Sequence, residues 1–354
     1  MSKLNLDQAE AQRRRLETQE IKSLLDKGTK RPDLQREVRQ KRIANWSKVF
    51  KSVNSFPSHP VIQWEEVLET KRILTIDRTK AVASGHLSEV YGARLLDGKS
   101  ATTAGGALAV KILRKSDFMS AFSIANPDRQ WKLLLQLNHP CIVRLLMLYE
   151  VVKTNKMILL MQRAKMGNLD QVVQQYGHVS EDLSKKWTRD LLWALDYLHN
   201  LGIGHRRVHP RHVLIQSPDS PAKLSIPDAF VEICDPVKRT PVDATGIGFV
   251  DEFVAPEAVF GSLFDVFALD IWGLGCTTFF MLTTRPPFSD VQNRVSMKQQ
   301  LDKRSWTQVG IVDSNPKLSE EAKDFIGSCL RGTISKRAHV PELLLSTWIA
   351  SLSL

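Results

Sequence analysis

Residues 204–215 read Gly204-His205-Arg206-Arg207-Val208-His209-Pro210-Arg211-His212-Val213-Leu214-Ile215. The stretch contains three histidines and three arginines, has no acidic residue, and ends in apolar residues. Histidines at this spacing suggest a metal site. The arginines would repel a divalent cation, and no nearby cysteine or carboxylate completes a ligand shell. We therefore expect no metal site in this stretch.

Apolar patterns on both sides of this stretch predict long helices. Before it, large apolar residues recur at helical spacing, at Leu183, Trp187, Leu191, Leu192, Leu195 and Leu198. After it, residues 271–282 form an apolar run that is shorter than the roughly 20 residues needed to span a bilayer. The second run therefore predicts a helix buried in a protein core.

Further motifs follow in a fixed order. The chain continues with Lys223-Leu224-Ser225-Ile226, then Val254-Ala255-Pro256-Glu257, then the segment 265–275 around Asp270 and Trp272, and finally Arg337. In order and spacing these segments resemble the protein kinase family, with residues 204–215 in the place of the catalytic loop. The resemblance covers about residues 70–350, and it includes the Ala-Pro-Glu motif and the central helix of the C lobe.

The resemblance implies an α+β, bilobal protein kinase-like fold with a β-rich N lobe and a mainly helical C lobe. Strand patterns at residues 73–76, 89–93 and 107–113 agree with such an N lobe. We place the kinase-like domain at residues 71–350, with the N lobe at 71–163 and the C lobe at 164–350. A basic, mostly helical extension is expected over residues 1–70.

The catalytic positions of the family pattern carry the wrong side chains for its chemistry. Arg207 occupies the place of the aspartate that accepts the substrate proton, and His209 that of the lysine. His212 replaces the asparagine that holds magnesium, and Ile226 replaces the metal-binding aspartate. Asp228 lies two residues too late for that role unless the loop is shifted. A site with a cation in place of its base cannot run the reaction conventionally, so we expect no catalytic residue and no metal ligand here.

Part of a nucleotide pocket is nevertheless implied by the resemblance. The glycine loop keeps one glycine of three, a lysine matches the one that contacts the α- and β-phosphates, and a glutamine replaces the glutamate that normally pairs with that lysine. The expected remnant consists of Gly85, Val90, Ala109, Lys111, Gln130 and the gatekeeper Met161. A neutral partner holds the lysine less firmly than a charged one. The alternative interpretation of Lys111 is that it simply ends a strand, with its side chain in solvent.

Four residues are expected to support the fold. The resemblance implies a buried ion pair between Glu257 of Ala-Pro-Glu and Arg337, and it places Asp270 and Trp272 on the central C lobe helix. Breaking a buried pair leaves one charge uncompensated, which typically costs about 3–5 kcal/mol.

We interpret this pattern as a catalytically inactive kinase-like protein, a pseudokinase that acts as a scaffold or binding module in a larger assembly. It is expected to be no enzyme and to use no cofactor, with weak metal-independent ATP binding left open. One alternative is an unconventional ATP-dependent serine/threonine kinase with rearranged metal ligands, such as Asp228. Another is a basic nucleic-acid-associated structural protein, although no aromatic-rich basic stripe is present.

Charge and cysteine usage bear on partners and location. Of the net charge of +11, the first 50 residues carry 13 Lys or Arg and 7 Asp or Glu, a net +6. The extension is either a solvated charged helix or an anchor for protein partners, an acidic cytoskeletal polymer or a nucleic acid. The C lobe is a second expected protein-binding surface. Four scattered cysteines without a Cys-x-x-Cys pair and the absence of a secretory signal predict a cytoplasmic protein without membrane contact.

Overall fold

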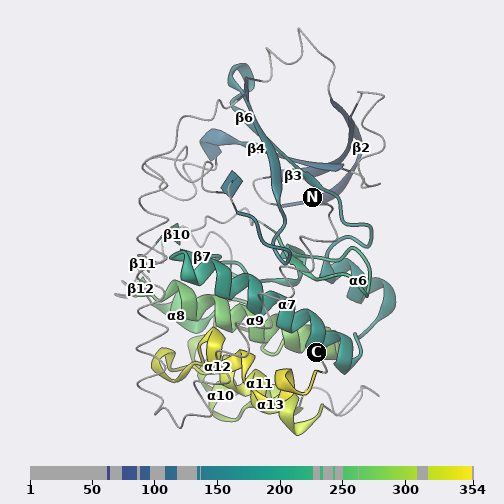
Figure 1. Ribbon diagram of the computed structural model, residues 1–354. Helices are drawn as coiled ribbons and strands as arrows, with labels where there is room; N and C mark the ends of the chain where they lie inside the picture. The colour runs from purple at the N-terminus through teal and green to yellow at the C-terminus, as the bar shows by residue number, and fades with distance from the viewer. Residues whose placement is uncertain are drawn as a thin grey trace.

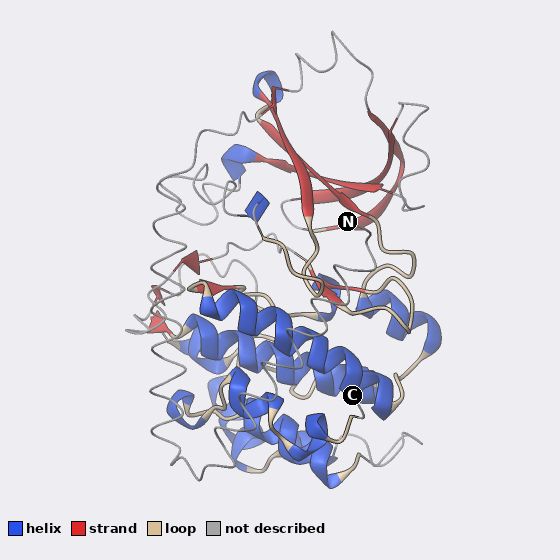
Figure 2. Cartoon of the chain, viewed as in Figure 1, coloured by secondary structure: helices blue, strands red, loops and turns tan. Residues whose placement is uncertain are grey.

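The computed structural model describes residues 62–63, 74–85, 88–95, 108–117, 134–135, 137–225, 232–233, 242–243, 250–261, 263–308 and 318–352. Strands gather in an upper N lobe and helices in a lower C lobe (Figures 1 and 2). The prediction of a bilobal protein kinase-like fold is confirmed. The helical extension falls on residues 1–61 and 64–70, outside the described residues, so its structure and the domain boundaries stay predictions.

The N lobe is a six-stranded sheet with the order β1-β5-β6-β4-β3-β2. All pairs are antiparallel except that of β1 with β5, which is parallel. Its strands are β1 (Ile62–Gln63), β2 (Leu74–Ser84), β3 (Ser88–Leu95), β4 (Leu108–Arg114), β5 (Leu145–Val151) and β6 (Lys156–Gln162), with the short helix η1 (Val152–Thr154) between the last two.

Both faces of this sheet are buried at its centre. Side chains alternate across a strand, so on β4 Ala109 packs into the main core while Val110 joins a second cluster with Tyr149 and Ile158. The side chain of Lys111 follows on the same face as Ala109, which is the face turned toward the C lobe core. The sheet therefore positions one lysine above the junction of the lobes.

The C lobe is built around two long helices that lie side by side (Figure 1). Its helices are α6 (Leu169–Tyr176), α7 (Glu181–Asn200), α8 (Pro256–Phe260), α9 (Val266–Thr283), α10 (Arg294–Asp302), α11 (Glu320–Cys329), α12 (Val340–Leu344) and α13 (Thr347–Ala350), with the 3-10 turns η2 (Pro210–His212), η3 (Ser305–Gln308) and η4 (Ile334–Lys336). Two-residue strands complete it, namely β7 (Ile203–Gly204), β8 (Val213–Leu214), β9 (Lys223–Leu224), β10 (Glu232–Ile233), β11 (Val242–Asp243) and β12 (Leu263–Phe264).

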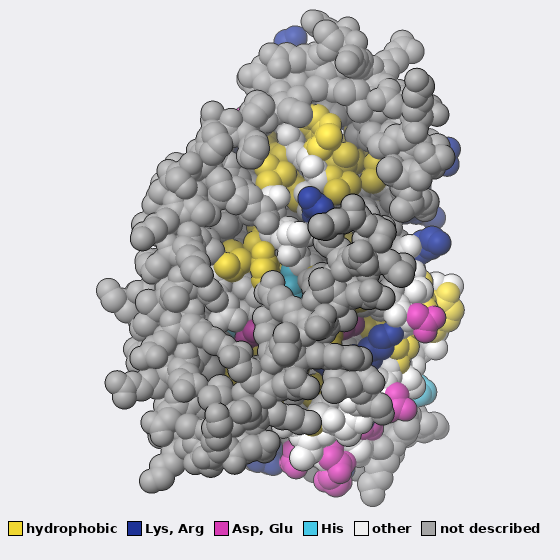
Figure 3. All heavy atoms as spheres, in the orientation of Figure 1, with side chains coloured by type: hydrophobic (Ala, Val, Ile, Leu, Met, Phe, Trp, Pro, Cys, Tyr) yellow, Lys and Arg dark blue, Asp and Glu magenta, His cyan; other side chains and the backbone are white. Residues whose placement is uncertain are grey.

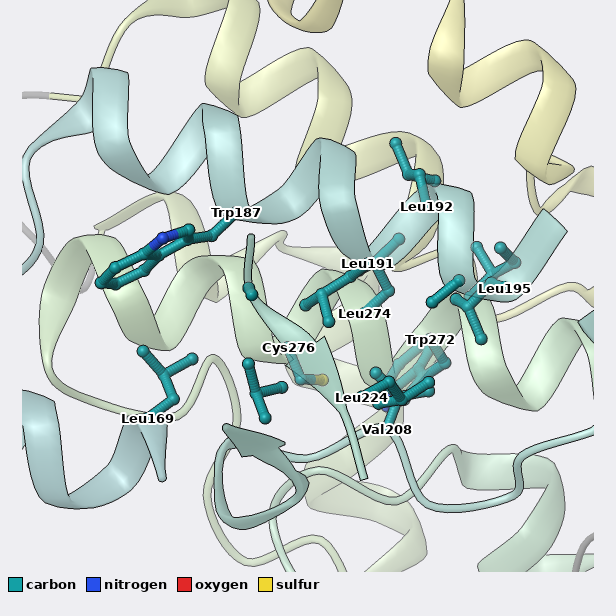
Figure 4. Close-up of a cluster of buried hydrophobic side chains, with 14 of the residues drawn as sticks. Leu169, Trp187, Leu191, Leu192, Leu195, Val208, Leu224, Trp272, Leu274 and Cys276 are labelled. Carbon is teal, nitrogen blue, oxygen red and sulfur yellow. The ribbon is translucent and has the colours of Figure 1, made fainter. Parts of the chain in front are cut away.

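Every residue of helix α9 is buried, and the helix is mainly apolar on all sides, with Asp270 and three threonines as the polar exceptions. Figure 4 shows how Trp272 and Leu274 from α9 meet Leu191 and Leu195 from α7. Among the described residues, this is the one helix long and apolar enough to cross a membrane, and protein covers it completely. The predicted buried helix is thus the core of the C lobe.

Two glycines allow the segment around residues 204–215 to rest directly on α9. A Cβ atom at Gly273 would lie 2.5 Å from the carbonyl oxygen of Val208. A Cβ atom at Gly204 would likewise collide with the Val266 side chain. Such distances are shorter than real Cβ contacts, so the missing side chains are what lets the loop approach the helix.

Candidate active site

The buried carboxylate of Asp270 holds the backbone of the loop that follows β7. Asp270 of α9 accepts hydrogen bonds from the backbone N–H groups of His205 at 2.8 Å and Arg206 at 2.7 Å. Its Oδ2 also lies 2.9 Å from His199 Nε2. Burial raises the pKa of Asp270 to about 7, although the two backbone bonds and His205, when it is protonated, oppose the rise. Asp270 therefore sets the backbone path of the loop.

The loop is also tied to the strand that follows it. The backbone N–H of Ser225 donates to the carbonyl oxygen of His212 at 2.7 Å, and His205 Nε2 lies 2.7 Å from the carbonyl oxygen of Ser225. Burial lowers the pKa of His205, so the ring is neutral near pH 7 and its Nε2–H donates to Ser225. The described chain stops at Ser225, immediately before Ile226.

Arg207 and His209 converge on a carboxylate from a distant part of the chain. Arg207 Nη2 donates to Asp251 Oδ2 at 2.6 Å, and His209 Nε2 lies 3.5 Å from the same oxygen. These residues line a small cavity of about 10 Å³, about the space of one water molecule. Burial raises the pKa of Asp251, while the Arg207 charge limits the rise.

His209 is a neutral ring with a defined tautomer. Its Nδ1 accepts the backbone N–H of Arg211 at 3.0 Å and thereby caps η2. The proton consequently sits on Nε2, which faces Asp251. Burial, followed by the charges of Arg207 and Arg211, lowers the pKa of His209 to about 3. The positive charge of this loop at neutral pH thus comes from its arginines and not from His209.

His212 faces the N lobe lysine. Burial and then the charge of Lys111 hold its pKa well below the usual value, so His212 is also neutral. Ring centroids of His205 and His209 lie 6.4 and 6.3 Å from that of His212. Lys111 itself is 7% exposed. A lysine on the sheet and a neutral imidazole on the loop therefore border the same space between the lobes.

The other described pocket residues surround this lysine on the sheet. Val90 pairs in register with Lys111, and Ala109 with Met161, so the four side chains occupy neighbouring strands. Gly85 closes the β2–β3 turn through its N–H bond to the Ser88 carbonyl at 2.8 Å. Figure 3 shows hydrophobic side chains gathered on the N lobe, with basic and histidine side chains below them where the lobes meet.

A polar contact joins the two lobes at the start of α6. Asn168 and Gln171 form a reciprocal capping box, and Gln171 Nε2 also donates to the Val82 carbonyl of β2 at 3.3 Å. Nearby, Arg211 Nε lies 3.4 Å from Asp170 Oδ2. The edge of the cleft is therefore linked both to β2 and to the loop.

Arg337 and Glu257 form a pair against α9, the helix that carries the other two fold-supporting residues, Asp270 and Trp272. Arg337 donates to both carboxylate oxygens of Glu257, at 2.5 and 3.0 Å, and to the carbonyl oxygen of Ala268 at 2.8 Å. Its guanidinium carbon lies 5.0 Å from the centroid of a Trp272 ring. Bidentate contacts of this kind fix geometry as well as charge.

Some predicted site residues cannot be placed, and one participant was missed. Gln130, Ile226 and Asp228 lie outside the described residues. Asp251 was not recognised from the sequence, where it is 44 positions away from Arg207. Its only local signal is its place four residues before Ala255 of the Ala-Pro-Glu motif.

The described side chains do not form a magnesium site. Magnesium prefers oxygen ligands in octahedral geometry, whereas His212 offers a nitrogen where the family pattern has an amide oxygen. Within the described ranges, no group of three His, Cys, Asp or Glu side chains could hold a metal ion. No step of the chemistry is therefore assigned to a metal bound by these residues.

Known proteins with similar sequences are kinases. The chain is 30% identical over 265 residues to the serine/threonine-protein kinase RAD53 of Saccharomyces cerevisiae, covering 70% of this chain and 30% of that protein. It is 28% identical to the human SNF-related serine/threonine-protein kinase, covering 77% of this chain and 33% of that one. For CBL-interacting protein kinase 11 of Oryza sativa subsp. japonica these values are 27%, 76% and 50%. The chain thus spans half or less of the length of these relatives.

Solved structures with a similar fold also come from a protein kinase. A crystal structure of Rad53 residues 1–466 in complex with AMP-PNP superimposes with a TM-score of 0.59 at 28% identity, covering 78% of this chain and 65% of that one. A structure of the Rad53 kinase domain and SCD2 gives a TM-score of 0.58 at 27% identity, covering 79% and 89%.

These findings correct two predictions. The absence of enzymatic activity is contradicted because the relatives are serine/threonine kinases. The absence of a cofactor is contradicted for the same reason, since kinases use ATP with magnesium. The substitutions at Arg207, His209, His212 and Ile226 therefore do not by themselves establish inactivity.

The family described as Protein kinase domain matches residues 77–349, which is more than half of the chain. This range contains the N lobe sheet apart from β1 and the first residues of β2, the loop at 204–215 and the Glu257–Arg337 pair. The chain belongs to the protein kinase domain family.

Proposed function

We propose that this chain is an ATP-dependent serine/threonine protein kinase that works with rearranged catalytic groups. Asp251 accepts the proton of the substrate hydroxyl, the role that the loop aspartate has in the family pattern. The observation that carries the proposal is the approach of the Asp251 carboxylate to Arg207, at 2.6 Å, and to His209, at 3.5 Å. A carboxylate thus lies beside the loop although the loop has none.

The environment of Asp251 suits a general base. Burial raises its pKa, and a more basic carboxylate is a better proton acceptor as long as it stays ionised. The Arg207 charge opposes this rise and keeps the ionised form accessible. Oδ1 accepts the Phe253 N–H at 3.0 Å, so both oxygens have fixed positions.

The proposed reaction is in-line phosphoryl transfer. The substrate hydroxyl oxygen forms a bond to the γ-phosphorus of ATP while the bond from that phosphorus to the bridging oxygen of ADP breaks. The hydroxyl proton passes to Asp251, and ADP leaves with the electron pair of the broken bond. We expect Lys111 to bind the phosphates, with Arg207 adding positive charge beside the base. If a magnesium ion accompanies ATP, Asp228 would supply the carboxylate that is missing at Ile226, and the ion would neutralise phosphate charge.

A matched pair of variants tests the base. The full chain is assayed for transfer of radiolabelled phosphate from ATP to itself and to a mixed serine/threonine substrate protein. Asp251→Asn is expected to lower kcat at least 100-fold because general-base catalysis contributes about 10²–10⁴. Glu252→Gln removes the neighbouring exposed carboxylate and is expected to stay within about threefold of the parent.

ATP binding is tested separately by thermal shift. Lys111→Ala is expected to weaken stabilisation by ATP, whereas Asp251→Asn keeps it. Asp228→Asn is expected to reduce the magnesium-dependent part alone. Phosphate transfer that is unchanged in Asp251→Asn, or absent from the parent chain, would contradict the proposal.

A further inference from the structure

A large groove lies in the C lobe, apart from the candidate active site. Its volume is about 1080 Å³, and α8, α10, α11 and η4 border it. It shares no lining residue with the small cavity around Arg207 and Asp251. In Figure 1, α10 and α11 lie in the lower part of the molecule, beneath α9, and α8 lies beside α9. A ligand in this groove would therefore leave the space between the lobes open.

The groove has an apolar floor. Met297 of α10, Trp306 of η3 and Leu330 after α11 line it and are almost completely buried, and Phe260 and Leu301 are partly exposed. An apolar side chain of a partner would find contacts along this floor.

The rim of the groove is positively charged. Five basic residues line it, namely Arg294, Lys298, Arg304, Arg331 and Lys336. Within the part of the chain that the structure describes, none of the five makes an ion pair. Apart from Arg331, all are exposed, so their charge is available to a ligand.

The acidic residues of the groove do not cancel this charge. Glu257 is held by Arg337, and Asp265 caps α9 by accepting the N–H groups of Phe267 and Ala268. Asp302 is the remaining lining acid, and it is exposed between the cations. The net field at the rim therefore attracts anions.

We propose that this groove docks an acidic segment of a partner protein that carries an apolar anchor residue. Carboxylates of the segment pair with the basic rim, and the anchor packs on the floor around Phe260 and Leu301. The first 50 residues of this chain have a net charge of +6 and are repelled by the same rim, so they are not the occupant, and we assign the segment to another protein. The proposal holds whether or not the chain transfers phosphate.

A labelled peptide tests the groove on the full chain. The probe is a fluorescein-labelled octapeptide, Asp-Glu-Glu-Phe-Leu-Glu-Asp-Glu, followed by fluorescence anisotropy at low salt. We expect saturable binding that weakens as salt is added. The double variant Lys298→Glu, Arg304→Glu is expected to raise Kd at least tenfold. Arg144→Glu, an exposed charge reversal on the N lobe, is expected to leave Kd within about twofold.

Two further peptides separate the charges from the anchor. Replacing every acidic residue by its amide is expected to abolish binding, and replacing Phe and Leu by Ser is expected to raise Kd at least fivefold. The proposal is overturned if the parent chain does not bind the probe at millimolar concentration. It is equally overturned if the groove variant behaves like Arg144→Glu, or if the serine peptide binds as well as the probe. Circular dichroism of each variant checks that the fold is retained.

Discussion

Two arginine–carboxylate pairs in this molecule have the same chemistry but different surroundings. Arg337 and Glu257, with side chains 0% and 10% exposed, form a bidentate pair reinforced by backbone carbonyls. Arg207 and Asp251, 15% and 13% exposed, share one short contact beside His209. The first pair has a fully buried arginine and more hydrogen-bond partners, although Glu257 also lines the C lobe groove, whereas the second borders a small cavity next to the loop. The two pairs thus differ in burial and in their further hydrogen bonds. We assign a structural role to Arg337–Glu257, and the proposed function uses Arg207–Asp251.

The comparison also shows a reversal of charge at the loop. In the family pattern the loop carries the acid, whereas here the loop carries Arg207 and the acid comes from the segment before α8. A cation and a carboxylate still meet at this place. Under the proposed function, Asp251 takes the role of the acid that the loop lacks.

The largest effect is expected from Arg337→Met. The change leaves the carboxylate of Glu257 without its partner under α9, so the free energy of unfolding should fall by about 3–5 kcal/mol. Urea denaturation of the full chain measures it. Arg144→Met, at an exposed position, should change it by less than about 0.5 kcal/mol. An equal loss of unfolding free energy in the two variants would contradict a specific stabilising role for the Arg337–Glu257 pair.

The pH dependence of stability tests the surroundings of the Arg207–Asp251 pair through its neighbour His209. His209 has a folded pKa of about 3, below its usual 6.5, so the unfolded chain binds more protons between these values. Stability is then lost as pH falls through this window, by up to about 1.4 kcal/mol per pH unit from this residue. His209→Asn keeps a capping side chain but cannot titrate. Between pH 6 and 4 the parent should therefore lose stability more steeply than the variant, and parallel curves would refute a buried neutral His209.

Gly273→Ala should disturb the contact between α9 and the loop. The new methyl group would lie 2.5 Å from the Val208 carbonyl, and overpacking of this kind costs about 1–3 kcal/mol. Gly327→Ala on α11 is the control, because its methyl group would lie at an ordinary 3.4 Å from Trp306. The control should be neutral or slightly stabilising, since alanine favours helix. Thermal unfolding compares the two, and similar melting temperatures would mean that the loop does not rest tightly on α9.

The smallest effect concerns a third arginine pair, Arg211 with Asp170. The Arg211 side chain is 67% exposed and its Nε is 3.4 Å from the carboxylate. A double-mutant cycle with alanine at both positions should give a coupling energy below about 1 kcal/mol that shrinks as salt is added. A coupling as large as that of Arg337 and Glu257 would contradict the link between burial and strength.

The sequence was sufficient for the fold because its signals were local and repeated. The apolar stripe around Trp187 and Leu191 predicted α7, and the apolar run at 271–282 predicted the core of α9. The candidate site was harder because its key contact joins distant residues. Nothing in the vicinity of Arg207 indicates Asp251, and the neutral state of His209 depends on burial that only the folded chain creates.

The parallel pairing of β1 with β5 has a practical consequence for dissecting this chain. Ile62 and Gln63 are in register with Tyr149 and Glu150, although the kinase domain match begins at residue 77. A protein truncated to begin at residue 77 would lack β1, and the main-chain hydrogen-bonding groups at the edge of β5 would be exposed. Uncovered strands invite self-association, so recombinant fragments should start upstream of residue 62 to remain monodisperse.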